Sequence, residues 1–160
     1  MVLSLVAEIR TRAKPPVQFL GASSFTLGRV APLLPLTEAG IAGLSPDERE
    51  RLDALATRFA RCQQMAGAAF KTLALLEAEP QARFIDLLAL MQKRGLIESI
   101  AAWDAQRDLR NDIGHVYIGT DGDAAAFLTA IGNLAPAVAA YAARLRGYAA
   151  TLGIGDHPGR

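Results

Sequence analysis

The sequence predicts an all-α fold, a four-helix (up-and-down) bundle with an N-terminal extension. Three observations support this prediction: apolar residues recur every three or four positions, helix-capping sequences stand before the apolar stretches, and sustained period-two alternation is absent. With 160 residues, 51% of them hydrophobic, the chain is long enough to form one domain with a substantial core. We expect an extension at 1–44 that packs on the bundle, the bundle at 45–152 and a flexible tail at 153–160.

The N-terminal extension begins with apolar residues at helical spacing, from Val2 to Ala13, and Pro15-Pro16 ends that segment. Residues 17–44 are rich in glycine and proline and have no sustained period. We therefore expect a segment that wraps the bundle and contains one short helix.

The first bundle helix is predicted to begin after Ser45, because Ser45, Pro46 and Glu48 form a capping box with proline in the first turn. Pro80 predicts its end near Glu79. The apolar positions between them keep a three-four rhythm over Leu52, Leu55, Phe59, Cys62, Ala66, Phe70, Leu73 and Leu76. This pattern also places Cys62, the single cysteine, in the core.

Three further helices complete the predicted bundle. A second helix carries Phe84 to Met91 and is closed by Gly95, and a third is opened by Ile97, Ile100 and Trp103. The turn Thr120-Asp121-Gly122-Asp123 then resembles a capping box more than a divalent-metal site. The fourth helix has its apolar positions at Phe127, Ile131, Leu134, Val138, Tyr141, Leu145, Tyr148 and Leu152.

Residues 124–143 contain no charged side chain, so they need a membrane check. The segment is mostly alanine and includes Thr129, Asn133 and Pro136, which makes its drive to insert weak. A buried bundle helix or a helix at a subunit interface is the better interpretation. The N-terminus reads poorly as a signal peptide, and a lone cysteine suits a reducing compartment, so we expect a cytoplasmic protein.

The most informative residues are 110–117, which read Arg-Asn-Asp-Ile-Gly-His-Val-Tyr at the end of the predicted third helix. Helical geometry would align Asn111 with His115, and Arg110 with Tyr117. The same geometry turns the apolar positions of this stretch inward, namely Leu109, Ile113 and Val116. The overall charge is only +1, so any contact with nucleic acid must be a local patch of this kind.

Arginine and histidine in this arrangement suit phosphodiester chemistry without a metal or another cofactor. The guanidinium of Arg110 presents a planar fork to a phosphate, and the imidazole of His115 can take or give a proton near neutral pH. Asn111 would orient the imidazole or contact the ribose. One copy supplies one such histidine, so an acid–base pair requires two copies that face each other in a homodimer. The alternative interpretation is structural: a histidine at a helix C-terminus commonly stabilises the helix dipole.

Taken together, Arg110-Asn111-x-x-x-His115-x-Tyr117 resembles the signature of the HEPN superfamily, and more closely its HepT group. The preceding residues from Ala89, with Gly95-Leu96-Ile97 and Trp103, are also similar to that group. The resemblance covers about Ser45 to Thr151, so residues 1–44 lie outside it.

The resemblance implies a helical bundle that acts as a homodimeric, metal-independent endoribonuclease toxin on RNA such as tRNA or mRNA. Arg110 and His115 would be catalytic, with Asn111 as the supporting polar residue. Tyr117 would match a tyrosine that a cognate minimal nucleotidyltransferase, the antitoxin, modifies with AMP. The same resemblance leaves an alternative open, a non-catalytic substrate-binding or regulatory partner of a nucleotidyltransferase.

Overall fold

The computed structural model describes residues 26–114 and 119–153, and within these ranges the protein is helical and contains no strand. A 3-10 turn, η1 (Ala31–Leu33), follows the helical residues 26–30, and a short helix, α2 (Glu38–Ala42), precedes the bundle. The larger helices are α3 (Pro46–Leu76), α4 (Phe84–Lys93), α5 (Ile100–Asp112) and α6 (Asp121–Thr151). The all-α prediction is thus confirmed for the described residues.

Both long helices begin at the predicted capping boxes. The Ser45 hydroxyl accepts from the backbone N–H of Glu48, and the Glu48 carboxylate accepts from the backbone N–H of Ser45. Thr120 and Asp123 make the same reciprocal pair at the start of α6. Each box satisfies N–H groups that a helix start leaves without a partner. Asp123 therefore caps a helix, as expected.

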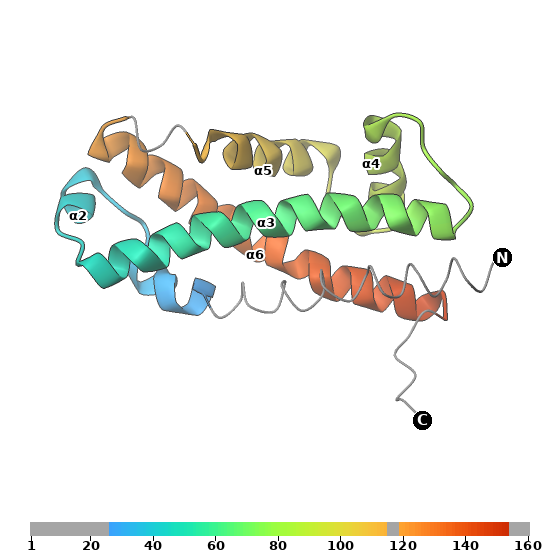
Figure 1. Cartoon of the computed structure of the whole chain (residues 1–160), viewed down its shortest axis with the longest axis horizontal. Helices are drawn as coiled ribbons and strands as arrows, with labels where there is room; N and C mark the ends of the chain where they lie inside the picture. The colour runs from blue at the N-terminus through green and yellow to red at the C-terminus, as the bar shows by residue number, and fades with distance from the viewer. Residues whose placement is uncertain (1–25, 115–118, 154–160) are drawn as a thin grey trace, which may run out of the picture.

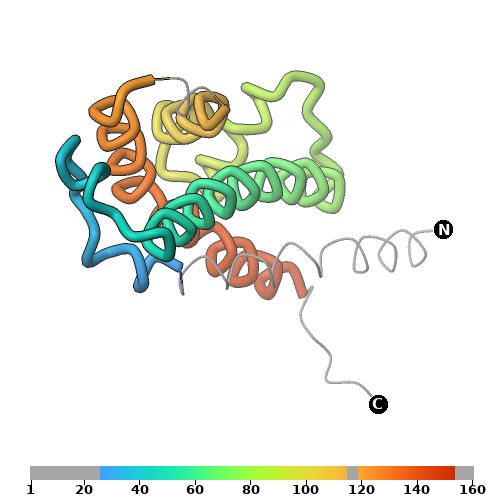
Figure 2. The backbone as a smooth tube through the Cα atoms, turned by 60° about the vertical axis from the view of Figure 1, so that its left-hand side comes forward, coloured from blue at the N-terminus to red at the C-terminus, as the bar shows by residue number. Residues whose placement is uncertain are grey.

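Helices α3 and α6 run in the same direction, α5 runs opposite to both, and the shorter α4 lies across one end (Figures 1 and 2). Contacts between side chains fix this register. On α3 and α6, Phe70 lies against Tyr141, and Glu77 accepts from Tyr148, seven residues further along both helices. The core of the bundle is therefore the space between α3, α5 and α6.

Three aromatic rings fill the centre of this core, one from each of the three helices. The Phe70 and Trp103 centroids are 5.2 Å apart, and Tyr141 lies 5.7 Å from Trp103 and 5.9 Å from Phe70. Ring pairs at these separations stabilise a core by about 0.5–1.5 kcal/mol beyond the area they bury. Cys62 is also buried, as the sequence predicts. The aromatic cluster fixes α5, which carries the candidate motif, against both long helices.

Helix α3 ends at Leu76, three residues before the predicted end at Glu79. Ala78 adopts a left-handed conformation with φ 56°, and the N–H of Glu79 returns to the carbonyl of Ala74. This turn brings Glu77 to Tyr148 and to Arg94, which also pairs with Glu79, so the ends of α3, α4 and α6 are joined by charge and hydrogen bonds. An alanine in that conformation gives no sequence signal comparable to glycine.

Gly95 closes α4 as predicted, with φ 71° and hydrogen bonds typical of a Schellman motif. Helix α5 begins at Ile100 because Ser99 is its N-cap, so Ile97 is buried in the connection rather than in the helix. The predicted third helix is therefore present with a later start.

The described part of the N-terminal region packs on α6 and holds more helix than the single short one expected. The backbone N–H of Leu36 donates to the Thr129 hydroxyl at 2.9 Å. Leu34 lies so close to Gly132 that a side chain there would meet it. Capping also explains α2, because the Thr37 hydroxyl accepts from the N–H of Gly40.

Helix α6 is, among the described helices, the one long and apolar enough to cross a membrane. About 39% of its most apolar window is buried inside the structure. Its predicted apolar positions face the core at Ile131, Val138 and Tyr141, whereas Leu152 is 39% exposed. The core contacts support the interpretation of α6 as a bundle helix.

Candidate functional site

Helix α5 carries the first part of the 110–117 motif to one end of the bundle. Its N-terminus is fixed by Ser99, whose hydroxyl accepts from the N–H of Ala102 at 3.0 Å. Leu109 and Ile113 are partly buried against the core, as the helical pattern predicts. The opposite face of α5, including Asn111, is exposed. The helix therefore separates into the apolar and polar faces expected from the sequence.

Arg110 is held by two neutral side-chain oxygens. Its Nη1 donates to the Oε1 of Gln63 on α3 at 2.7 Å. Its Nη2 and Nε donate to the Oδ1 of Asn111 at 3.1 and 3.4 Å. A guanidinium has five N–H donors, so two of the five, one on Nη1 and one on Nη2, have no acceptor among the described residues. Arg110 is thus oriented by the protein and still able to donate to a ligand.

The neighbouring Arg107 has a different environment. It pairs with the carboxylates of Asp104 at 3.0 Å and Asp108 at 3.5 Å, both on the same helix. Two acidic groups therefore offset its positive charge. Arg110 makes no ion pair with a described carboxylate, so its charge remains available to an anion. This contrast makes Arg110, rather than Arg107, the candidate phosphate ligand on α5.

Gln63 is fully buried among apolar residues of α3. Its Oε1 accepts from Arg110, whereas its Nε2 has no partner among the described residues. Position 63 follows Cys62 directly and is not one of the apolar positions of α3, so the pattern alone assigns it no role. Sequence reasoning missed Gln63, because only the antiparallel packing of α5 on α3 brings it to Arg110.

A second buried glutamine, Gln106, lies on α5 one turn before Arg110. The Oε1 of Gln106 accepts from the Tyr141 hydroxyl at 2.6 Å, and both residues are buried. Burial raises the pKa of Tyr141, so its hydroxyl stays protonated and serves as the donor. The bond ties α5 to α6 as the bond to Arg110 ties it to α3. The face of α5 that carries the candidate arginine is therefore fixed on both sides.

The other two motif residues, His115 and Tyr117, lie outside the described residues. Helix α5 ends at Asp112 with Ile113 as its C-cap, so its register is described only to that point. The alignments of Asn111 with His115 and of Arg110 with Tyr117 remain predictions. Of the four predicted site residues, the structure brings Arg110 and Asn111 together by hydrogen bonds.

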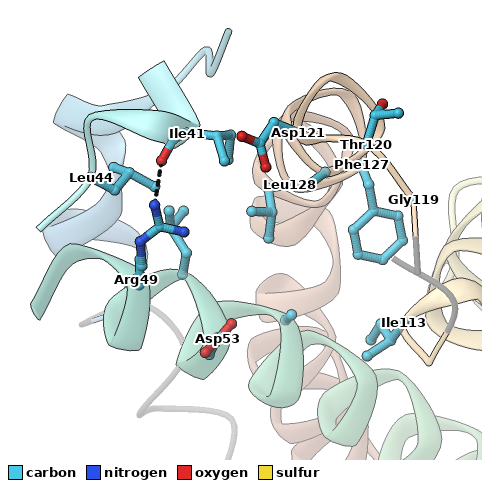
Figure 3. A pocket seen from close by; sticks show the side chains of 13 residues that line it. Ile41, Leu44, Arg49, Asp53, Ile113, Gly119, Thr120, Asp121, Phe127 and Leu128 are labelled. Carbon is cyan, nitrogen blue, oxygen red and sulfur yellow. Dashed lines mark hydrogen bonds between the residues drawn. The ribbon is translucent and has the colours of Figure 1, made fainter. Parts of the chain in front are cut away.

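A cavity of about 220 Å³ lies beside the connection from α5 to α6, between the N-terminal ends of α3 and α6 (Figure 3). Most of the residues that line it are apolar, and Arg49, Asp53 and Asp121 contribute charge of both signs. Arg49 is oriented by its bond to the carbonyl of Ile41 at 2.8 Å. Arg110 does not line the cavity, so the cavity and the oriented arginine are separate features.

Comparison with known proteins does not assign a family. No protein-family model, no curated protein and no solved structure matches the chain. Any statement about function therefore depends on the residues themselves and on the sequence resemblance described above.

Proposed function

We propose that the protein is a metal-independent endoribonuclease toxin of the HEPN type, paired with a minimal nucleotidyltransferase as antitoxin. The helices would form a HEPN-type four-helix bundle, in which α4 is the shortest member. Two copies would face each other and form one composite site. The observation that carries this proposal is the oriented guanidinium of Arg110, which pairs with no carboxylate of the described residues and lies five residues before the motif histidine.

The proposed reaction is transesterification of RNA. The 2′-hydroxyl oxygen attacks the adjacent phosphorus, the bond to the 5′-oxygen breaks, and the products carry a 2′,3′-cyclic phosphate and a 5′-hydroxyl. One imidazole takes the proton from the 2′-hydroxyl, and a second gives a proton to the leaving oxygen. His115 of each copy fills one of these roles, which is why the site requires a dimer.

Arg110 stabilises the negative charge that develops on the phosphoryl oxygens during this reaction. A donor already oriented before the reaction needs little rearrangement, and removing one such donor typically lowers kcat by about 10²–10³-fold. Asn111 supports this role because its Oδ1 accepts from two nitrogens of Arg110. Asn111 would therefore position Arg110, in addition to orienting the imidazole or contacting the ribose.

Tyr117 is the proposed site of AMP modification by the antitoxin. An attached AMP group adds negative charge and bulk two residues from His115, and both would exclude an RNA phosphate. The modification would silence the toxin without unfolding it. Mass spectrometry of the protein co-expressed with a neighbouring nucleotidyltransferase should detect one added AMP or more on Tyr117, and none on Tyr117→Phe.

The proposal is tested with purified protein and RNA in the presence of EDTA. We expect cleavage that leaves 2′,3′-cyclic phosphate ends and that falls by about 10²-fold or more in His115→Ala. Cleavage that requires an added divalent metal, or that is undiminished in His115→Ala, would refute the assignment. A stable complex with a nucleotidyltransferase, without cleavage or toxicity of the protein alone, would instead establish the non-catalytic partner.

A further inference from the structure

We infer that Gln63 is a positioning residue for Arg110, which it holds in place while leaving its positive charge intact. The inference deepens the proposed function and depends on it, because it assigns Arg110 to an RNA phosphate. Gln63 itself does not touch RNA in this assignment. It acts from the core of α3, on the far side of the arginine from the substrate.

The contact between these two side chains is short and deeply placed. The side chain of Gln63 is 0% exposed, and its Oε1 lies 2.7 Å from Nη1 of Arg110, across 47 residues of sequence. One turn further along α3, the Trp103 ring lies against Gly67, where an added Cβ would be 3.4 Å from the indole. This close approach fixes the distance between α3 and α5, so Gln63 cannot move away from Arg110 without repacking the core.

The chemistry of the acceptor decides what Arg110 can do. A carboxylate would hold the guanidinium equally well but would neutralise it, as Glu77 and Glu79 do for Arg94. An amide oxygen gives the same direction and leaves a full positive charge. The guanidinium of Arg110 is therefore held in a fixed orientation and is not neutralised by Gln63, and both properties suit a group that binds an RNA phosphate.

Gln63 is difficult to explain by stability alone. Its Nε2 is buried without a partner among the described residues, and an unpaired buried donor is unfavourable. An apolar residue of similar length would pack at this position without that penalty. Among the described residues, Arg110 is the hydrogen-bond partner of this side-chain amide, so we assign Gln63 to the arginine.

Three variants separate orientation from charge. Gln63→Met keeps the length and charge of the side chain and removes the acceptor. Gln63→Glu keeps an acceptor and neutralises Arg110. Gln64→Glu is the matched control, because Gln64 is the adjacent residue of the same helix and is exposed. Far-UV circular dichroism and a single cooperative melt establish that each variant folds.

Binding is measured by fluorescence anisotropy with a short, fully 2′-O-methylated RNA, which cannot be cleaved, over a range of salt concentrations. We expect Gln63→Glu to weaken binding by about tenfold or more, because a charge-assisted hydrogen bond is lost, and Gln64→Glu by less than about threefold. Gln63→Met should make the negative slope of log K against log salt shallower by about 0.7, because one phosphate contact is lost. If Gln63 only stabilised the fold, the slope would stay unchanged, because Gln63→Met removes no charge and every phosphate contact would remain.

Cleavage kinetics provide the second readout, and Arg110→Lys keeps the experiment decisive if the core variants fail to fold. Lysine preserves the charge and lacks the planar fork that Gln63 holds, so we expect kcat to fall by about tenfold or more with a smaller change in KM. The inference would be overturned if Arg110→Lys had the kcat of the wild type, or if Gln63→Glu and Gln64→Glu bound RNA equally well. In either case, cleavage by the wild type would still support the proposed function. A wild type that neither binds nor cleaves RNA would refute the proposed function itself, and this inference with it.

Discussion

The same substitution, glycine to alanine, should have opposite effects at two positions of α6. At Gly132 an added Cβ would lie 2.2 Å from Cδ1 of Leu34, whereas at Gly147 it would meet no atom within 4 Å. Alanine is favoured over glycine in a helix interior by about 1 kcal/mol, so Gly147→Ala should stabilise the protein by about that amount.

At Gly132 this gain is opposed by overpacking. Carbon atoms in contact are normally about 3.5–4.0 Å apart, so the half-buried Leu34 would have to move by more than 1 Å and lose part of its contact with the core. Overpacking costs about 1–3 kcal/mol, which leaves Gly132→Ala about 1 kcal/mol less stable than the wild type.

Differential scanning calorimetry measures both effects. A change of 1 kcal/mol shifts Tm by about 2–4 °C in a chain of this size, so we expect Tm to rise by about that much in Gly147→Ala and to fall by a similar amount in Gly132→Ala. Equal increases in Tm for the two variants would show that Leu34 does not pack on α6 at Gly132. That result would contradict the packing of the N-terminal region on α6.

Two further predictions concern buried and capping hydrogen bonds. Tyr141→Phe leaves the Oε1 of Gln106 buried without its donor, so we expect a loss of about 1–3 kcal/mol in the free energy of unfolding by urea denaturation, and a loss below about 0.5 kcal/mol would contradict the assigned bond. The pKa of Asp123 is lowered below its ordinary value of 3.8 by hydrogen bonds from the backbone N–H and then the hydroxyl of Thr120. Its contribution to stability is therefore present above about pH 4 and is lost as pH falls through the lowered pKa. We expect Asp123→Asn to reduce Tm at pH 7, and we expect a smaller further fall in Tm at pH 2–3 in this variant than in the wild type. Equal dependence of Tm on pH in the two proteins would contradict the assigned cap.

Local signals in the sequence predicted the starts of the two long helices and the end of α4. Ser45, Thr120 and Gly95 each act through hydrogen bonds to residues within a few positions, so their neighbours in the sequence suffice to identify them. The early end of α3 escaped prediction because the left-handed residue is Ala78, and its turn is supported by contacts of Glu77 with α4 and α6.

The candidate site was predictable only in part for a similar reason. The motif itself identified Arg110 and Asn111, which are adjacent in sequence and share a hydrogen bond. Gln63 and Tyr141 act on α5 from other helices, and no local pattern pairs residues 47 positions apart. Such partners emerge only when the register of α5 on α3 and α6 is known.

In the proposed site the charge of Arg110 is available to an RNA phosphate, whereas that of Arg107, one turn away on α5, is offset by Asp104 and Asp108. The most direct test is kcat for RNA cleavage in EDTA by Arg110→Ala and Arg107→Ala, two variants that remove the same group from the same helix. We expect kcat to fall by about 10²–10³-fold for Arg110→Ala and to change by less than about threefold for Arg107→Ala. Equal kcat values for the two variants would contradict this assignment.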